Sequence, residues 1–215
     1  DNQVRVMEVG PRDGLQNEKA LVPTPVKAEF VRRLAAAGLG VVEATSFVHP
    51  RWVPQLADAE ELLLALDAER DTLPRLPVLV PNERGLDRAL AHGCREVAVF
   101  ASATETFAQR NLNRTLDTQW EMFEPTMARA KEHGLFVRGY LSMCWGDPWE
   151  GAVPVDQVVT QGLRLLDLGA DQLSLGDTIG VGTAGQVREL LRAFVAAGVG
   201  IDKVAVHFHD TYGQA

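Results

Sequence analysis

The chain has 215 residues, of which 46% are hydrophobic and 23% charged, a composition typical of a globular protein with a sizeable core. Its formal net charge of −8 at pH 7 argues against a general nucleic-acid binder, because neutralising phosphates requires clustered Lys and Arg. No apolar run approaches the roughly 20 residues of a membrane helix, so we expect no membrane partner.

The two cysteines, Cys94 and Cys144, are too few and too far apart in sequence for a disulfide framework. We predict that both thiols are buried small hydrophobic groups in a reducing, intracellular setting. The first residue is Asp1 rather than Met, so a removed targeting segment is compatible with the sequence. The expected location is a bacterial-type cytoplasm, or the mitochondrial matrix if such a segment was removed.

Short apolar runs alternate with amphipathic stretches along the whole chain. In chain order, the predicted strands span 4–9, 41–45, 76–80, 95–101, 135–143, 171–175 and 202–208. The predicted helices span 25–37, 56–69, 84–92, 117–133, 155–168 and 184–197. Thr183 and Gln186 fit a capping box at the start of the last helix. Five glycines are expected to end helices in the left-handed conformation: Gly38, Gly93, Gly134, Gly169 and Gly198.

Strand, helix and strand at this cadence predict parallel βα units. No linker or charge block interrupts them, so we expect one catalytic domain over residues 1–215. An open nucleotide-binding sheet is disfavoured, because "GPRDG" after the first strand is not the G-x-G-x-x-G turn of that fold. We therefore favour an α/β fold of the TIM (β/α)8 barrel type, incomplete here with about seven strands. Strand eight and its loops would lie beyond this chain.

Active sites of such barrels lie at the carboxyl ends of the strands. The polar residues near those ends are Arg12, Asp13, Glu43, Asn82, Ser102, Thr104, Arg138, Asp177, His207 and His209. Glu43 and Arg138 each interrupt an apolar strand, where an unpaired charge is costly. They could neutralise each other or turn outward. We favour a role in organising a site, because both are expected toward the same end.

His207 and His209 lie two residues apart on the last predicted strand, so both side chains share one face, about 6.5–7 Å apart along the backbone. Most such pairs bind no metal. Asp13 favours a metal site at this pair, since a nearly closed barrel would place Asp13 only one strand away. Two imidazoles and one carboxylate would leave open coordination positions on a divalent ion. Asp177 or Asp210 could orient a ligating imidazole, although Asp210 could equally be a turn carboxylate.

Five separated segments, "VGPRDGLQNE", "VVEATSFVHPRWVPQLAD", "VRGYLSM", "LSLGDTIGVGT" and "VHFHDTYGQA", together resemble the 3-hydroxy-3-methylglutaryl-CoA lyase family. The likeness runs over the whole chain in the family's order. It implies a metal-dependent βα-barrel lyase of leucine degradation and ketone body formation, which cleaves 3-hydroxy-3-methylglutaryl-CoA to acetyl-CoA and acetoacetate. The implied cofactor is Mg²⁺ or Mn²⁺, and the implied partners are an acyl-CoA substrate and a second copy in a homodimer.

The resemblance also implies roles for residues at matching positions. The implied metal ligands are Asp13, His207 and His209; the catalytic residues are Arg12, Glu43, Asp177 and His207; and the substrate-binding residues are Arg12, Gln16, Arg138 and Asn111. In such a retro-Claisen cleavage the metal would lower the pKa of a tertiary alcohol, and Arg12 would stabilise the departing enolate. The family's catalytic Cys and Asn metal ligand would lie beyond strand seven, so a chain that truly ended at Ala215 should be inactive.

Three alternatives compete with this interpretation. A related synthase of the isopropylmalate or homocitrate type shares the Arg-Asp-Gly motif and the His pair, but typically has Glu where this chain has Leu15. A barrel kept only as a scaffold would make the polar strand ends accidental and would show no metal dependence. A phosphate-sugar barrel would need a phosphate-binding loop after strands seven and eight, which would follow Ala215.

Overall fold

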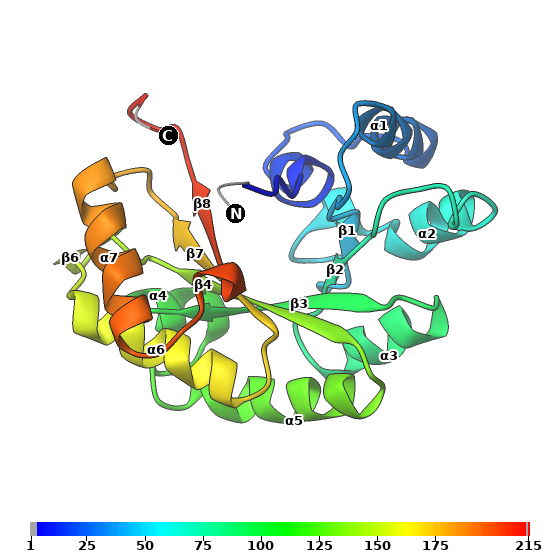
Figure 1. The fold of residues 1–215 in the computed structure, drawn as a ribbon. Coiled ribbons are helices and arrows are strands. Elements are labelled where there is room, and N and C mark those ends of the chain that lie inside the picture. The colour runs from blue at the N-terminus through cyan, green and yellow to red at the C-terminus, as the bar shows by residue number, and fades with distance from the viewer. Residues whose placement is uncertain (1–3, 214) are drawn as a thin grey trace. The chain divides into compact units, whose positions relative to one another are not determined.

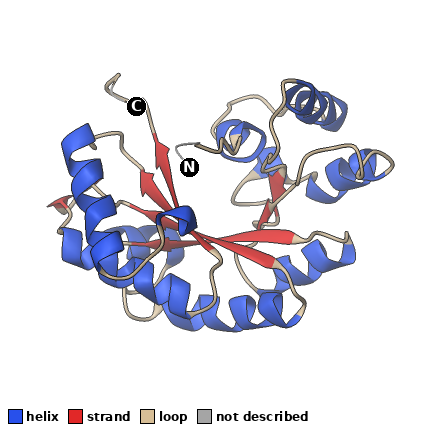
Figure 2. Ribbon diagram, viewed as in Figure 1, coloured by secondary structure: helices blue, strands red, loops and turns tan. Residues whose placement is uncertain are grey.

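The computed structural model describes residues 4–213 and 215. The chain divides into two compact units, residues 1–98 and 99–215. In both units parallel strands alternate with helices, as Figures 1 and 2 show for each unit taken by itself. The hydrogen-bonded strand order is β1-β2-β3 in the first unit and β3-β4-β7-β8 in the second. These parallel βα units confirm the predicted α/β fold of the TIM-barrel type.

The first unit begins with a π-helical turn and continues with three short βα steps. Its elements are the turn Gly10–Gly14, α1 (Thr24–Ala36), β1 (Thr45–Ser46), the 3-10 turn Pro54–Leu56, α2 (Ala59–Asp67), β2 (Val78–Leu79), α3 (Glu83–Ala91) and the start of β3 (Glu96–Ser102). β1 pairs with β2, and β2 pairs with β3, all in parallel. Ala28, Val31, Val42, Leu62 and Leu66 form a buried apolar cluster under α1 and α2.

The prediction of a buried strand over 4–9 is wrong for most of its length. Only Glu8 pairs, through a parallel bridge to Val42, while Val4 and Val6 are 90% and 65% exposed. In parallel register the residues before Glu8 would face the segment just after α1. That segment turns at Gly38 with a positive φ of 91° and offers no extended partner. The apolar residues are present as the pattern shows, but residues 4–7 have no neighbouring extended segment among the described residues to form strand hydrogen bonds with.

The second unit holds the longer strands. Its elements are the end of β3, α4 (Glu105–Phe107), the π-helical turn Ala108–Leu112, α5 (Gln119–Glu132), β4 (Phe136–Ser142), the hairpin β5 (Gly146–Asp147) and β6 (Gly151–Ala152), α6 (Val155–Asp167), β7 (Gln172–Asp177), α7 (Ala184–Ala196), the 3-10 turn Ile201–Lys203 and β8 (Val204–Phe208). β4 pairs with β7 and β7 with β8, again in parallel.

Close packing of helices against these strands fixes the second unit. Gly162 on α6 lets the helix approach its neighbours, since a Cβ there would lie 2.6 Å from the Phe194 ring and 2.9 Å from Leu173. Phe194 and Leu173 are fully buried, as are Trp120 and Phe123 of α5. Figure 1 shows α6 and α7 side by side along this layer. The packing holds the carboxyl ends of β7 and β8 in a defined register.

All six predicted helices are confirmed, each to within three residues at either end. The capping box of Thr183 and Gln186 forms at the start of α7, and the five predicted cap glycines all have positive φ. Cys94 and Cys144 are buried free thiols, as predicted. Burial raises the pKa of Cys94 to about 11 and raises the pKa of Cys144 further still. Within the described residues, none of the helices is both long and apolar enough to cross a membrane.

Candidate active site

Arg12 is held between two carboxylates in the first unit. Its Nε donates a hydrogen bond to Glu43 Oε1, and its Nη1 donates to Asp13 Oδ1 at 2.7 Å. Arg12 is only 7% exposed and Glu43 is fully buried, so neither charge could be tolerated there without the other. Glu43 therefore fixes the guanidinium, and the guanidinium in turn fixes Asp13. The three residues that the sequence singled out here are brought together.

The local fold explains why Arg12 and Asp13 project from adjacent positions. The π-helical turn Gly10–Gly14 carries Pro11 near its start, and the backbone amides of Arg12 and Asp13 both donate to the carbonyl of Val9, at 3.1 and 2.7 Å. Such single π-turns are often found at functional sites. Glu43 lies just before β1, where its amide donates to the carbonyl of Glu8 at 2.8 Å. This link brings the turn and β1 into contact.

His207 and His209 share one face of β8 in the second unit, as predicted. Their ring centroids are 4.8 Å apart, whereas Phe208 between them packs on Trp145 at 5.6 Å. His209 Nδ1 lies 2.8 Å from the carbonyl oxygen of Thr178. Because a carbonyl only accepts, Nδ1 carries the proton, and in the neutral ring the lone pair is then on Nε2. That tautomer suits a metal ligand.

Asp177 shapes the turn that carries Thr178. The buried carboxylate accepts hydrogen bonds from the backbone amides of Val181 at 3.0 Å and Gly182 at 2.8 Å. Gly180, at φ 72°, packs so closely that a Cβ would lie 2.5 Å from the carbonyl oxygen of His209. Asp177 thus positions the His209 imidazole through a backbone turn. The expected direct bond from Asp177 or Asp210 is replaced by the Thr178 carbonyl.

Asp210 behaves as the turn carboxylate that the sequence left open. It is exposed, and its Oδ1 accepts from the amide of Ala215 at 3.1 Å.

Arg138 does not lie where its place in the sequence pattern predicted. It pairs in register with Gln172, the first residue of β7, whereas Asp177 ends that strand five residues later. At about 3.3 Å per residue this separates the two levels by roughly 16 Å. Arg138 donates to the side chains of Gln172 and Ser174 and lies over the Tyr140 ring. The expected position toward the carboxyl end is wrong, and these contacts support a packing role.

The two remaining residues predicted to bind substrate, Asn111 and Gln16, are both at least partly accessible to solvent. Asn111 is exposed in the turn that follows α4, and its neighbour Arg110 stacks on Trp149 at 4.5 Å. Gln16 is half-buried just after the Arg12 turn. Their roles in binding substrate stay predictions.

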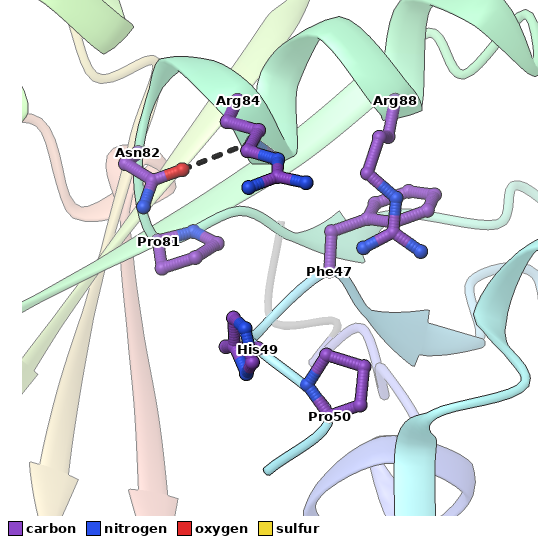
Figure 3. A pocket seen from close by; sticks show the side chains of 8 residues that line it. Phe47, His49, Pro50, Pro81, Asn82, Arg84 and Arg88 are labelled. Atoms are coloured by element: carbon purple, nitrogen blue, oxygen red, sulfur yellow. Dashed lines mark hydrogen bonds between the residues drawn. The ribbon is translucent and has the colours of Figure 1, made fainter. Parts of the chain in front are cut away.

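A pocket in the first unit was not singled out from the sequence. It has a volume of about 440 Å³ and is lined by the following residues of the loops after β1 and β2 and of α3: Phe47, His49, Pro50, Pro81, Asn82, Arg84, Gly85 and Arg88. Figure 3 shows the Arg84 and Arg88 side chains reaching from one face of α3 toward His49 and Pro50. The four-residue spacing of the two arginines was the available signal.

Thr178 was the other omission. Its backbone oxygen makes the contact with His209, so no side-chain pattern could have marked it.

Comparisons with known proteins agree with this geometry. Residues 3–215 match the HMGL-like family model. The chain is 51% identical to the mitochondrial hydroxymethylglutaryl-CoA lyase of Arabidopsis thaliana, over 99% of this chain and 45% of the relative, and 49% identical to the cytoplasmic 3-hydroxy-3-methylglutaryl-CoA lyase of Danio rerio, over 99% and 62%. It therefore spans roughly half to two thirds of the length of these relatives.

Solved structures give the same result. The crystal structure of hydroxymethylglutaryl-CoA lyase from Pseudomonas aeruginosa superposes with a TM-score of 0.92 and 44% sequence identity, covering 99% of this chain and 70% of that one. Fold, motifs and sequence identity all point the same way. The chain belongs to the HMGL-like family.

Proposed function

We propose that the protein carrying this chain cleaves 3-hydroxy-3-methylglutaryl-CoA to acetyl-CoA and acetoacetate. The observation that carries the proposal is the buried Arg12 guanidinium, clamped by Glu43 and Asp13 beside the start of β1. Relatives at 49–51% identity are named for this lyase activity, which favours it over the condensing synthases. Residues 1–215 would form part of one catalytic barrel domain.

Arg12 supplies fixed positive charge for the cleavage step. The bond that breaks joins the carbon bearing the hydroxyl to the carbon next to the thioester, and its electron pair moves onto the thioester fragment as an enolate. A preorganised cation at that position is among the largest catalytic effects, because it needs no rearrangement as charge develops. As the hydroxyl carbon becomes the ketone of acetoacetate, its oxygen gives up the hydroxyl proton, and addition of one proton to the enolate carbon gives acetyl-CoA. Glu43 acts as a positioning residue for Arg12.

We assign Asp13, His207 and His209 as ligands of a divalent cation, Mg²⁺ or Mn²⁺. The donor set fits such an ion: a carboxylate accompanies two imidazoles, and the Thr178 carbonyl sets the tautomer of His209 that presents Nε2. When bound, the ion would lower the pKa of the substrate hydroxyl. His207 would also contact the reacting hydroxyl, and Asp177 would hold the turn that orients His209.

The remaining assignments concern binding and cellular context. Gln16 would contact the acyl group, and exposed Asn111 would line the approach of coenzyme A. A homodimer is expected. The cytoplasm or the mitochondrial matrix would house the protein, since relatives named as mitochondrial and as cytoplasmic are both similar to this chain.

The test is acetoacetate release from 3-hydroxy-3-methylglutaryl-CoA by the full-length protein, measured alongside coenzyme A release. A lyase produces acetoacetate without releasing free coenzyme A, whereas a condensing synthase that consumes acetyl-CoA and a 2-oxo acid releases coenzyme A. We expect a chelator to abolish turnover and added Mg²⁺ to restore it. Arg12→Ala and Asp13→Ala should each lose activity by about 100- to 1,000-fold, the range typical for removal of one such electrostatic group. Arg33→Ala, on an exposed face of α1, is the matched control. Full activity in chelator would contradict the assignment.

A further inference from the structure

We infer that Gln55 is a positioning residue for substrate binding, because its side chain fixes the segment that carries Gln16. Gln55 lies in the 3-10 turn Pro54–Leu56, and its Nε2 donates to the backbone carbonyl of Glu18 at 2.7 Å. Both residues belong to the first unit. The contact between Gln16 and the acyl group rests on the proposed function, whereas the Gln55–Glu18 link is a property of the fold.

The segment after the Arg12 turn lies at the surface and is held mainly by local contacts. Asn17 and Glu18 are exposed, and their backbone amides donate to carbonyls only three residues earlier, at 3.2 and 3.1 Å. The Asn17 side chain donates to the Asp13 carbonyl at 2.9 Å. Such bonds hold the shape of the segment but do not fix its position on the unit. The bond from Gln55 does, because its partner lies 37 residues away in the sequence.

The 3-10 turn that carries Gln55 is itself fixed by a buried lysine. Lys27 on α1 is only 3% exposed, and its Nζ donates to the Gln55 carbonyl and to Asp58 Oδ1, each at 2.5 Å. The Thr24 hydroxyl, at the start of α1, donates to the other carboxylate oxygen of Asp58 at 2.6 Å. The backbone of the turn is therefore held to α1 while the Gln55 side chain reaches Glu18.

The buried ion pair of Lys27 and Asp58 defines a position more than it adds stability. Replacing such a pair by apolar side chains of similar size is often neutral or stabilising, because desolvation offsets the attraction between the charges. Apolar packing is already available here, since Ala28 and Val31 on α1 belong to the buried cluster between α1 and α2 (Figure 1). Apolar contacts have no direction, whereas the Lys27 ammonium fixes a carbonyl and a carboxylate at hydrogen-bond distance.

The Gln55–Glu18 link should act on substrate binding and not on the cleavage step. Arg12 is held by Glu43 and Asp13, and these two bonds do not involve Gln55. Gln16, by contrast, lies in the short stretch between the Asp13 carbonyl and the carbonyl that Gln55 binds. Without the link, Gln16 would sample more positions, and the substrate would have to order this stretch when it binds. That ordering lowers the affinity for the substrate.

The first experiment measures kcat and KM for 3-hydroxy-3-methylglutaryl-CoA in the full-length protein. Gln55→Met removes the amide at similar size, and we expect it to raise KM about three- to tenfold, as for loss of one hydrogen bond, with kcat unchanged. Gln55→Lys keeps an N–H donor that can reach Glu18 and should restore most of the affinity. Thr72→Val is the matched control, since it removes a 2.9 Å bond from an exposed side chain to the Glu69 carbonyl in the same unit.

A second variant tests the lysine that holds the 3-10 turn. Lys27→Met alone would leave Asp58 without its cation, so it is combined with Asp58→Leu, which removes both charges together. The double variant no longer binds the Gln55 carbonyl and should raise KM over the same range, again with kcat unchanged. A merely structural role would lower the urea midpoint and leave KM at the wild-type value, and that result would overturn the inference.

Amide hydrogen exchange separates this inference from the proposed function, because it needs no turnover. In Gln55→Met the amides of Asn17 and Glu18 should exchange about three- to tenfold faster than in wild type, while amides within α1 keep their rates. If wild type cleaves no thioester and this difference is still seen, the proposed function fails and the Gln55–Glu18 link stands. Equal exchange in Gln55→Met and wild type, or faster exchange with an unchanged KM, would overturn the inference.

Discussion

Replacing Glu43 by Gln should destabilise the protein strongly. The fully buried carboxylate neutralises Arg12, which is itself only 7% exposed, and an amide would leave that cation underpaired. Breaking a buried ion pair from one side costs about 3–5 kcal/mol, and the lower value applies here because Asp13 keeps its contact with Arg12. With a urea m-value of about 2–3 kcal/mol/M, the midpoint should fall by about 1–1.5 M.

The assay is urea unfolding followed by circular dichroism, with Arg12→Met, Glu43→Leu and the double variant completing a cycle. The double variant should be less destabilised than the two single variants together, because it leaves no unpaired buried charge. Glu29→Gln, which breaks the exposed pair with Arg33, is the control and should leave the midpoint unchanged. Additive effects in the cycle, or equal midpoints for Glu43→Gln and wild type, would refute the reasoning.

Three further outcomes follow from the second unit and the buried thiols. Gly180→Ala should weaken Mn²⁺ binding at least tenfold in calorimetry, because the new Cβ would clash with the carbonyl oxygen of His209. The control is Gly213→Ala, since Gly213 has a similar positive φ but a Cβ there would contact nothing. Mn²⁺ binding should not change in this variant. Asp177→Asn keeps only one acceptor oxygen for two backbone amides and should lose about 1–3 kcal/mol in urea unfolding. Burial raises the pKa of Cys94 from 9.0 to about 11, which favours the neutral thiol in the folded state. That stabilisation should be complete below pH 9 and lost toward pH 11, and iodoacetamide should alkylate folded Cys94 at pH 8 roughly 100-fold more slowly than the unfolded chain.

The helices could be predicted from the sequence because their signals are local. Apolar stripes at three- and four-residue spacing, a capping box at Thr183 and a glycine after five of the six predicted helices all act within one or two turns. The strand at 4–9 could not be predicted as reliably, because a strand needs a partner. Its apolar alternation said nothing about the Gly38 turn, which removes the extended segment that residues 4–7 would have paired with.

The residues of the candidate site also fall into those whose position could be predicted from the sequence and those whose position could not. Arg12, Asp13 and Glu43 were marked by charges next to apolar strands, where burial is tolerated only for paired groups. Arg138 is likewise a charged residue within an apolar strand, yet its register with Gln172 places it at the amino end of the sheet. A charged residue in an apolar strand therefore predicts nearby polar partners, but not the end of the strand at which it lies.

The hydrogen bond between His209 and the Thr178 carbonyl has a consequence for evolution and engineering. Every amino acid carries that carbonyl, so no single replacement at position 178 deletes the acceptor. The Thr178 hydroxyl, which accepts from the amide of Met143 at 2.8 Å, is the part that substitution can remove. Single substitutions should therefore leave the orientation of the His209 imidazole unchanged. Insertions or deletions between Asp177 and Gly182 would move the Thr178 carbonyl and so change that orientation. Libraries aimed at a new metal preference should vary side chains there and keep the loop length constant.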